Sequence, residues 1–259
     1  MHDMITSRDN PVFKRLKKLA ESSRARRDAR MTLLDGAHLI EAYFDAGGHL
    51  NVLLCAASCA ASVWQPLAAR CEGAKVVAIA DSLFAELSPV ESPTGVLAEA
   101  AWLEAKAEKS ATPLVLLLED IQDPGNLGSL LRSAAAASAT LAVLSKGCAD
   151  AWSPKALRGG QGAQFVLPML LRADLMAWIG SADLPVWALA LGGEKRLFDL
   201  DLKKPAAILL GNEGAGLSEG LLALATGRVA IPMPGRVESL NAAAAAAIAL
   251  FEAVRQRTH

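Results

Sequence analysis

The feature that most constrains the fold is a series of short, uninterrupted apolar runs in the second half of the chain, separated by stretches with helical patterns. The runs lie at residues 114–119, 141–145, 186–191, 206–211 and 228–232. A strand that is apolar on both sides has both of its faces buried, and strands that alternate with helices pair in parallel. The pattern therefore predicts an α/β fold in which helices cover both faces of a parallel sheet.

The first hundred residues predict a smaller α/β unit. Helical patterns occur at residues 33–47, 64–70 and 82–87, and strand patterns at residues 51–56, 75–80 and 95–102. Residues 101–113 then turn polar and end in Pro113, which is typical of a linker. The sequence therefore predicts two domains, at residues 1–105 and 113–259.

Composition excludes several classes of protein. With 259 residues, of which 53% are hydrophobic, the chain has ample apolar material for a core and is not a disordered chain. The longest uninterrupted apolar run, residues 242–251, is far shorter than the ~20 residues that span a bilayer. The N-terminus holds no apolar stretch that could act as a signal-peptide core. We therefore expect a cytoplasmic protein with no membrane partner.

The four cysteines predict neither a disulfide framework nor a metal site. Cys55, Cys59, Cys71 and Cys148 are scattered, and no CxxC pair or neighbouring histidine pair completes a zinc set. We expect buried, reduced thiols and no bound metal.

Charge is distributed unevenly along the chain. The net charge is −1, yet the first 30 residues contain nine basic and four acidic side chains. Within them Phe13 and Leu16 recur at helical spacing, so one helix face is expected to dock on the protein. The opposite face is either simply solvated or contacts a polyanion, with Arg8, Lys14, Lys17 and Lys18 as the candidate contacts.

Three segments contain more polar and glycine residues than packing requires. The first is residues 118–136, where an apolar strand is followed by Pro124, Gly125 and then Asn126 at the expected start of a helix. Asparagine in this position caps free backbone N–H groups. Arg132 follows in an otherwise small and apolar helix, where it needs water or an anion such as phosphate.

The second segment, residues 209–220, is a strand followed by a glycine-rich loop and a helix. Loops at the carboxyl ends of parallel strands bind ligands in open α/β sheets. Leu217 replaces the lysine of a P-loop, and Glu219 replaces the last glycine of a dinucleotide motif. The carboxylate of Glu213 inside the loop would repel phosphate, so we expect a ligand other than a polyphosphate.

The third segment, residues 229–253, is a strand, a proline-rich turn and an alanine-rich helix. Ser239 and Asn241 lie at the start of this helix, where Ser239 alone could be an N-cap. The small side chains of residues 242–247 permit close packing, either in the core or against a second subunit.

Taken in this order, the three segments resemble the signature motifs of the SpoU, or TrmH-like, branch of the SPOUT RNA 2'-O-ribose methyltransferases. The resemblance covers residues 113–257 and includes residues 153–168, which are similar to a basic, glycine-containing segment of the family. Residues 5–19 and 33–43 also resemble the L30e-like RNA substrate-binding domain that precedes the catalytic domain in many members.

The resemblance implies a SPOUT parallel-sheet domain with a deep trefoil knot, S-adenosyl-L-methionine as cofactor, and a homodimer. Carried over by motif position, the catalytic candidates are Asn126, Arg132, Glu213, Ser239 and Asn241. The cofactor-binding candidates are Leu189, Leu191, Gly192, Gly211, Asn212, Gly216, Ile231, Met233, Ser239 and Leu240. Arg132, Lys155 and Arg158 join the N-terminal cations as candidate RNA contacts.

The implied reaction is methyl transfer to a ribose 2'-hydroxyl of RNA, with ribosomal RNA favoured over transfer RNA. Alignment of the hydroxyl with the methyl group supplies much of the rate gain. Because arginine side chains release their proton so reluctantly, we expect Arg132 to bind phosphate and orient the hydroxyl, with a role as base as the lesser alternative. A tRNA 2'-O-methyltransferase and a catalytically silent RNA-binding protein are the competing interpretations.

Overall fold

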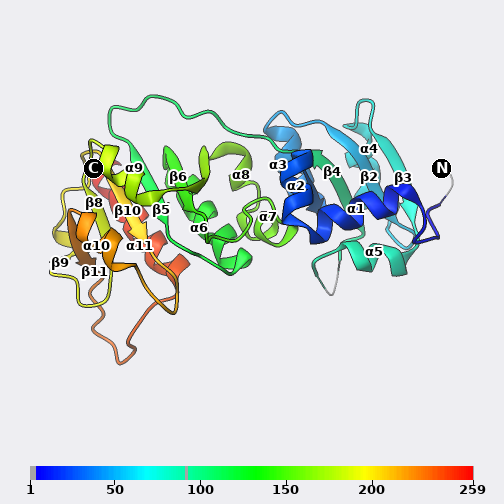
Figure 1. The fold of residues 1–259 in the computed structure, drawn as a ribbon. Coiled ribbons are helices and arrows are strands. Elements are labelled where there is room, and N and C mark those ends of the chain that lie inside the picture. The colour runs from blue at the N-terminus through cyan, green and yellow to red at the C-terminus, as the bar shows by residue number, and fades with distance from the viewer. Residues whose placement is uncertain (1–3, 91–92, 259) are drawn as a thin grey trace. The chain divides into compact units, whose positions relative to one another are not determined.

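The computed structural model describes residues 4–90 and 93–258, and the chain divides into two compact units. The first unit consists of Met1–Leu103 and Asp150–Phe165, and the second of Glu104–Ala149 and Val166–His259. Figure 1 shows the elements of both units along the chain. Residues 102–113, where the sequence predicts a linker, contain no helix or strand.

The first unit is built on a four-stranded sheet of order β1-β4-β2-β3, in which β2 and β3 are parallel and the other pairs antiparallel. In chain order its elements are α1 (Pro11–Glu21), α2 (Ser23–Ala29), β1 (Met31–Asp35), α3 (Ala37–Asp45), β2 (Leu50–Ala56), α4 (Ala61–Ala69), β3 (Lys75–Ile79), α5 (Asp81–Leu87), β4 (Val96–Ala101), α7 (Pro154–Gly160) and most of α8 (Ala163–Val166).

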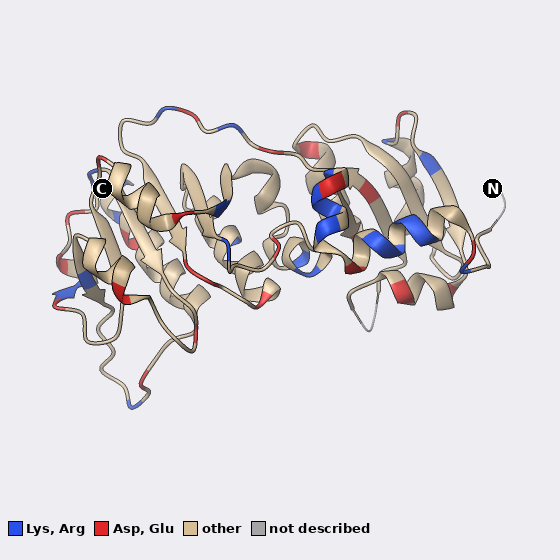
Figure 2. Cartoon of the chain, in the orientation of Figure 1, with Lys and Arg blue, Asp and Glu red and all other residues tan. Residues whose placement is uncertain are grey.

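The N-terminal helix α1 docks on this sheet, as its apolar spacing predicts. Phe13, Leu16 and Leu19 are buried in one core with Ile79 and Leu97. The cations between these apolar side chains face outward on α1, which Figure 2 shows as a run of blue.

The helix predicted at residues 33–47 is wrong at its start. Met31–Asp35 forms β1, which pairs antiparallel with β4, and the helix begins only at Ala37. Gly36 separates the two elements with φ of +98°, a backbone conformation that suits glycine. Leu33 and Leu34 are both buried because α1 and α7 both pack against β1.

The second unit is a seven-stranded parallel sheet of order β7-β6-β5-β10-β8-β11-β9. In chain order its elements are β5 (Leu114–Leu118), α6 (Pro124–Ala136), β6 (Leu141–Ser145), β7 (Met169–Ala173), α9 (Leu175–Ser181), β8 (Val186–Leu189), β9 (Lys195–Arg196), the 3-10 helix η1 (Leu197–Asp199), β10 (Ala206–Leu210), α10 (Glu219–Leu224), β11 (Gly227–Ala230) and α11 (Ala242–Thr258).

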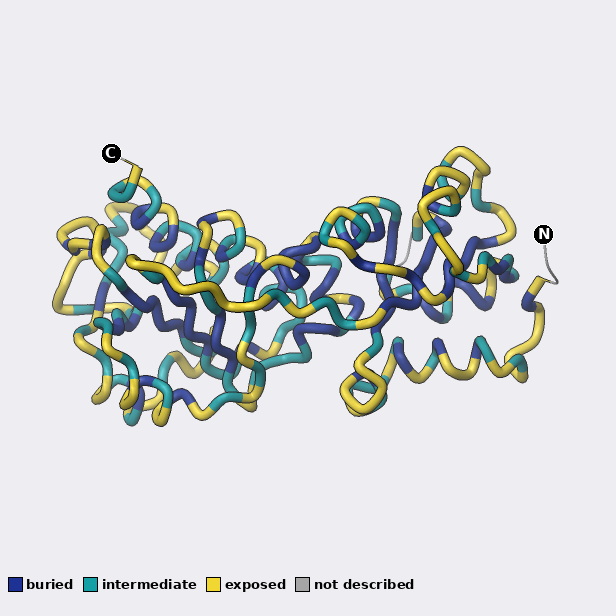
Figure 3. The backbone as a smooth tube through the Cα atoms, turned by 90° about the horizontal axis from the view of Figure 1, so that it is seen from above, coloured by how far each residue is buried: buried dark blue, intermediate teal, exposed yellow. Residues whose placement is uncertain are grey.

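The predicted parallel sheet is thus confirmed. Two of its strands, β7 and β9, are not predicted from the apolar runs in the sequence. β7 alternates half-buried and exposed residues at one edge of the sheet, and β9 at the other edge has only two residues. The central strands β5 and β10 are buried along their whole length, as the dark blue core in Figure 3 illustrates.

Helices cover the sheet of the second unit. Leu175 and Ile179 of α9 and Leu221 of α10 pack with residues of β5, β6, β8 and β10 in one buried core. The alanine-rich helix α11 packs against α6 and β10. Within residues 4–90 and 93–258, no helix combines the length and apolarity needed to cross a bilayer.

Candidate active site

Loops at the carboxyl ends of three neighbouring strands line one cavity in the second unit. The loops follow β8, β10 and β11, and the start of α11 completes the lining of a cavity of about 700 Å³. The carboxyl edge of a parallel sheet is where ligands bind in such folds. The cavity lining includes all ten residues proposed from the sequence for the cofactor, namely Leu189, Leu191, Gly192, Gly211, Asn212, Gly216, Ile231, Met233, Ser239 and Leu240.

Asn212 shapes the glycine-rich loop after β10. Its Oδ1 accepts hydrogen bonds from the backbone N–H groups of Gly214 at 2.8 Å and Ala215 at 3.0 Å. The backbone N–H of Gly216 donates to the Asn212 carbonyl at 2.8 Å and closes the turn. A Cβ at Gly211 would lie 2.3 Å from the carbonyl oxygen of Gly216, so only glycine allows the loop to fold back this closely.

Two acidic residues that follow β5 form hydrogen bonds that hold the same loop in place. Neither residue is predicted from the sequence to have a role. Glu119 Oε2 accepts from the backbone N–H of Ser218 at 2.8 Å, and the carbonyl of Asp120 accepts from Asn212 Nδ2 at 2.9 Å. Asp120 has φ of +52°, and its Oδ1 accepts from Ser145 Oγ at 2.6 Å. The position of Glu119 and Asp120 directly after a buried strand is the sequence signal that could have identified their contacts with this loop.

The first and second sequence motifs meet through Asn126 and Glu213. Asn126 Nδ2 donates a short hydrogen bond to Glu213 Oε1, and Glu213 also lines the cavity. The expected N-cap role of Asn126 is wrong, because Asp123 caps α6 by accepting from the Asn126 N–H at 2.8 Å. The cap lies one turn earlier, which frees the Asn126 amide to contact Glu213.

Ser239 and Asn241 both line the cavity, and Asn241 is the cap of α11. Its Oδ1 accepts from the backbone N–H of Ala243 at 2.9 Å, so the alternative of an N-cap at Ser239 is wrong. The side chain of Ser239 is exposed, and it makes no hydrogen bond within residues 4–90 and 93–258. Its hydroxyl is available to a ligand.

Arg132 is exposed on α6 and is not a lining residue of the cavity. Within the described part of the chain its guanidinium forms neither a hydrogen bond nor an ion pair. The structure therefore leaves this side chain in water, one of the two environments that the sequence requires for it.

Most N-terminal cations proposed to contact RNA have acidic neighbours. Arg8 pairs with Glu86 at 2.6 Å and Lys14 with Asp9 at 2.7 Å, which lowers the pKa of both carboxyls. Lys17 lies 3.0 Å from Glu21. Lys18 is exposed and forms no ion pair with any residue that the structure describes. Exposed ion pairs contribute little energy, so the carboxylates beside Arg8 and Lys14 do not prevent these two exposed cations from contacting RNA.

Lys155 and Arg158, the remaining RNA candidates, lie on α7 and so belong to the first unit. Arg158 Nη1 is 3.8 Å from Asp35 Oδ1 at the end of β1. The Asp35 side chain is fully buried, and this burial raises its pKa. Arg158 itself is 40% exposed.

The cysteines are free thiols, and only Cys55 is buried. Burial raises the pKa of Cys55 to about 12, so it is an inert thiol. The expectation of burial is wrong for Cys59, Cys71 and Cys148, which are half-buried. Among residues 4–90 and 93–258, no three His, Cys, Asp or Glu side chains are grouped as metal ligands.

The chain matches two family models in the order of its two units. Residues 113–251 match the SpoU rRNA Methylase family, and residues 10–98 match the MRM3-like substrate binding domain.

Two curated relatives extend over nearly the whole chain. An uncharacterized tRNA/rRNA methyltransferase of Synechocystis is 33% identical, over 98% of this chain and 94% of the relative. The 23S rRNA (guanosine(2553)-2'-O)-methyltransferase RlmP of Bacillus subtilis is 31% identical, over 95% of this chain and 97% of its own length.

A solved structure agrees with these relatives. The SpoU methyltransferase AviRb of Streptomyces viridochromogenes, crystallised with AdoMet, has a TM-score of 0.86 and 30% identity over 96% of this chain and 98% of its own. The family match, the full-length relatives and the shared fold lead to one conclusion: the chain belongs to the SpoU rRNA methylase family.

Proposed function

We propose that this protein transfers a methyl group from S-adenosyl-L-methionine to the 2'-hydroxyl of a ribose in ribosomal RNA. The observation that carries the proposal is the cavity lined by the second and third signature segments of this SpoU family member, to which the first segment is joined by the hydrogen bond from Asn126 to Glu213. Relatives named as 23S rRNA 2'-O-methyltransferases and a structural neighbour crystallised with AdoMet support both the substrate class and the cofactor.

The cavity fits S-adenosyl-L-methionine chemically. Its size lies within the range of about 300–1,000 Å³ that small-molecule sites occupy. Leu189, Ile231 and Leu240 offer apolar surface to an adenosyl group, and the close turn at Gly211 exposes backbone groups. The carboxylate of Glu213 favours a cationic ligand over a polyphosphate.

The residues in and near the cavity have different roles in the proposed reaction. The cofactor supplies an activated methyl group. Asn126 fixes the Glu213 carboxylate, and Asn241 fixes the start of α11 beside Ser239. Arg132 binds an RNA phosphate from its exposed position on α6 and orients the ribose hydroxyl.

Transfer of a labelled methyl group to purified rRNA and tRNA, followed by nuclease mapping, tests the proposal. We expect the label in a 2'-O-methylated nucleotide of rRNA. Label in tRNA would select the tRNA enzyme instead. Cofactor binding without transfer to free RNA or to an assembling ribosomal particle would contradict the proposed reaction, and absence of cofactor binding would favour a silent RNA-binding protein.

We further propose a cytoplasmic homodimer whose subunits each contain the trefoil knot implied by the family. The small side chains of the alanine-rich helix α11 permit close packing against a second subunit, and Phe251 on the same helix is 46% exposed. Sedimentation equilibrium should give twice the monomer mass. Mechanical extension of the folded chain should stop short of the full contour length, because a tightened knot retains several residues.

A further inference from the structure

The segment Asp150–Phe165 lies between β6 and β7 in the sequence, yet it packs in the first unit. Trp152 is fully buried there and stacks on Trp102, with ring centroids 5.1 Å apart. Thr32 Oγ1 donates to the carbonyl of Trp152 at 2.6 Å. The second half of the chain therefore contributes an integral part of the unit that matches a substrate-binding domain.

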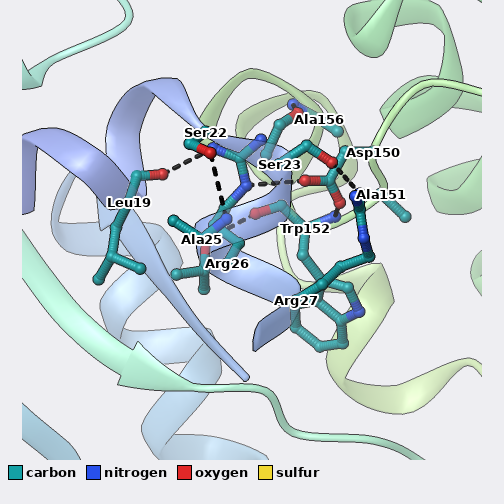
Figure 4. Close-up of polar contacts among 12 residues, drawn as sticks. Leu19, Ser22, Ser23, Ala25, Arg26, Arg27, Asp150, Ala151, Trp152 and Ala156 are labelled. Carbon is teal, nitrogen blue, oxygen red and sulfur yellow. Dashed lines mark hydrogen bonds and ion pairs between the residues drawn. The ribbon is translucent and has the colours of Figure 1, made fainter. Parts of the chain in front are cut away.

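A buried ion pair anchors the first residue of this segment. Arg26 of α2 is 4% exposed, and its Nε donates to Asp150 Oδ2 at 2.7 Å. Arg26 Nη1 also donates to the carbonyls of Leu19 at 2.6 Å and Ala20 at 3.0 Å. Figure 4 shows the Arg26 guanidinium between the Leu19 carbonyl and the Asp150 carboxylate. A desolvated pair with this many hydrogen bonds fixes the geometry of both segments.

The ion pair in turn sets the start of α7. Asp150 Oδ1 accepts from the backbone N–H of Trp152 at 3.0 Å, and Ser153 Oγ caps α7 by accepting from the Ala156 N–H at 3.2 Å. Both acceptors hold the turn that leads into the helix. The direction of α7, and with it the position of Arg158, therefore depends on Asp150.

Among the residues that the structure describes, Asp35 is the one carboxylate that pairs with Arg158. Its guanidinium is 3.8 Å from the buried Asp35 Oδ1, beyond hydrogen-bond distance, while 40% of its side chain is exposed. The other Asp35 oxygen accepts from Ser88 Oγ at 2.5 Å, which fixes the carboxylate. A guanidinium oriented by a carboxylate in this way keeps several N–H donors for a phosphate.

We propose that Arg26 and Asp150 are positioning residues for RNA: their ion pair holds α7 on the substrate-binding unit so that Arg158 contacts an RNA phosphate. This inference rests on the proposed function. It adds a cation from a segment encoded within the methylase half of the chain to the candidate RNA contacts of the first unit.

A double-mutant cycle in the full chain tests the inference, with binding of a labelled rRNA fragment measured over a range of salt concentrations. Arg158→Ala should weaken binding roughly tenfold and reduce the salt slope by about one, because one phosphate contact is lost. Asp150→Asn keeps an acceptor for the Trp152 N–H but removes the charge that holds Arg26. It should weaken binding too, although removal of an acidic group from a surface usually favours RNA.

The double variant Asp150→Asn/Arg158→Ala distinguishes an effect of Asp150 on the position of Arg158 from an effect of Asp150 on the stability of the fold. If Asp150 acts through Arg158, the double variant binds no more weakly than Arg158→Ala. Additive losses, or an unchanged salt slope in Asp150→Asn, would overturn the inference. If Asp150→Asn fails to fold, Arg26→Lys replaces it in the same cycle, because it keeps the positive charge beside Asp150 but loses the guanidinium that bonds Asp150 and the Leu19 carbonyl together.

Two controls complete the experiment. Lys75→Ala removes a cation from β3, at the opposite edge of the sheet from β1 and α7, and should leave RNA affinity within twofold. Cofactor affinity and methyl transfer are measured on every variant. Wild-type protein that neither binds RNA nor transfers a methyl group contradicts the proposed function, whereas active wild type with an unaffected Arg158→Ala contradicts only the positioning role.

Discussion

Arg132 stands on the exposed side of α6, and none of the described side chains binds its guanidinium. Its replacement should therefore cost little stability. We predict that Arg132→Ala lowers methyl transfer at least about 100-fold, as expected for loss of an orienting contact, and leaves cofactor affinity within a few-fold. Arg228→Ala, at an exposed position on β11, is the matched control. Unchanged turnover of Arg132→Ala in a filter-binding methylation assay would exclude the proposed role.

Glu119 supports the cavity without being one of its lining residues. Glu119→Ala leaves the Ser218 N–H without its acceptor, and a hydrogen bond to a charged group contributes about 1.5–3 kcal/mol. We predict about tenfold weaker cofactor binding by calorimetry. Glu119→Gln retains an acceptor oxygen and should recover most of the affinity. Equal binding by wild type and Glu119→Ala would show that the loop after β10 holds its shape unaided.

Glu252 on α11 gives the stability of the second unit a distinct acid dependence. Arg255 and then Gln256 donate hydrogen bonds to its carboxylate and lower its pKa from 4.5 to about 2. A lowered pKa in the folded state stabilises the fold above pH 4.5, and this contribution is lost as the pH falls toward 2. The difference in unfolding free energy between wild type and Glu252→Gln, measured by urea denaturation, should shrink over that interval. A difference that stays constant with pH would contradict the assignment.

At the scale of elements, the loop after β10 is a single close-packed turn. A Cβ at Gly211 would lie 2.3 Å from the Gly216 carbonyl oxygen, whereas one at Gly214 would meet only Asn212 Oδ1 at 3.5 Å. We predict that Gly211→Ala abolishes detectable cofactor binding and that Gly214→Ala, the control in the same loop, changes it less than about threefold. Comparable affinities for the two variants would indicate that the turn can open.

The elements also show where sequence reasoning succeeds and where it stops. Continuous apolar runs such as Leu114–Leu118 predict the central strands, because a strand of a parallel sheet that is covered on both faces buries every residue. Residues 33–35, at the end of β1, are predicted to be helical from the sequence, because Leu33 and Leu34 together with Leu39 and Ile40 also fit a helical period. Local pattern cannot choose between these alternatives, since pairing with β4 decides the outcome.

In the candidate site, too, the sequence predicts some features and not others. Motif residues such as Asn212 and Glu213 could be named from the sequence, whereas the bonds that brace them could not. Glu119 and Ser218 are 99 residues apart, and Arg26 and Asp150 are 124 apart. Only the folded chain brings such pairs together. Periodicity and capping rules concern neighbouring residues, so they cannot predict these contacts.

At the scale of the whole molecule, the two units share the chain in an interleaved order. The backbone passes between them after Leu103, after Ala149 and after Phe165. A fragment of residues 104–259 would thus carry Trp152, Leu157 and Phe165 without the unit in which they are buried. We predict that this fragment binds a hydrophobic dye several-fold more strongly than the full chain. Dye binding no greater than that of the full chain would mean that the segment refolds within the second unit.

The interleaving also dictates an order of events during synthesis. The N-terminal strands and helices emerge from the ribosome first, but the space in their core that Trp152 fills stays open until residues 104–152, which include β5, α6 and β6, have been translated. The first unit therefore cannot finish folding before β5, α6 and β6 of the second unit have been synthesised, and a nascent chain stalled ahead of residue 150 would present an incomplete first unit to chaperones and proteases.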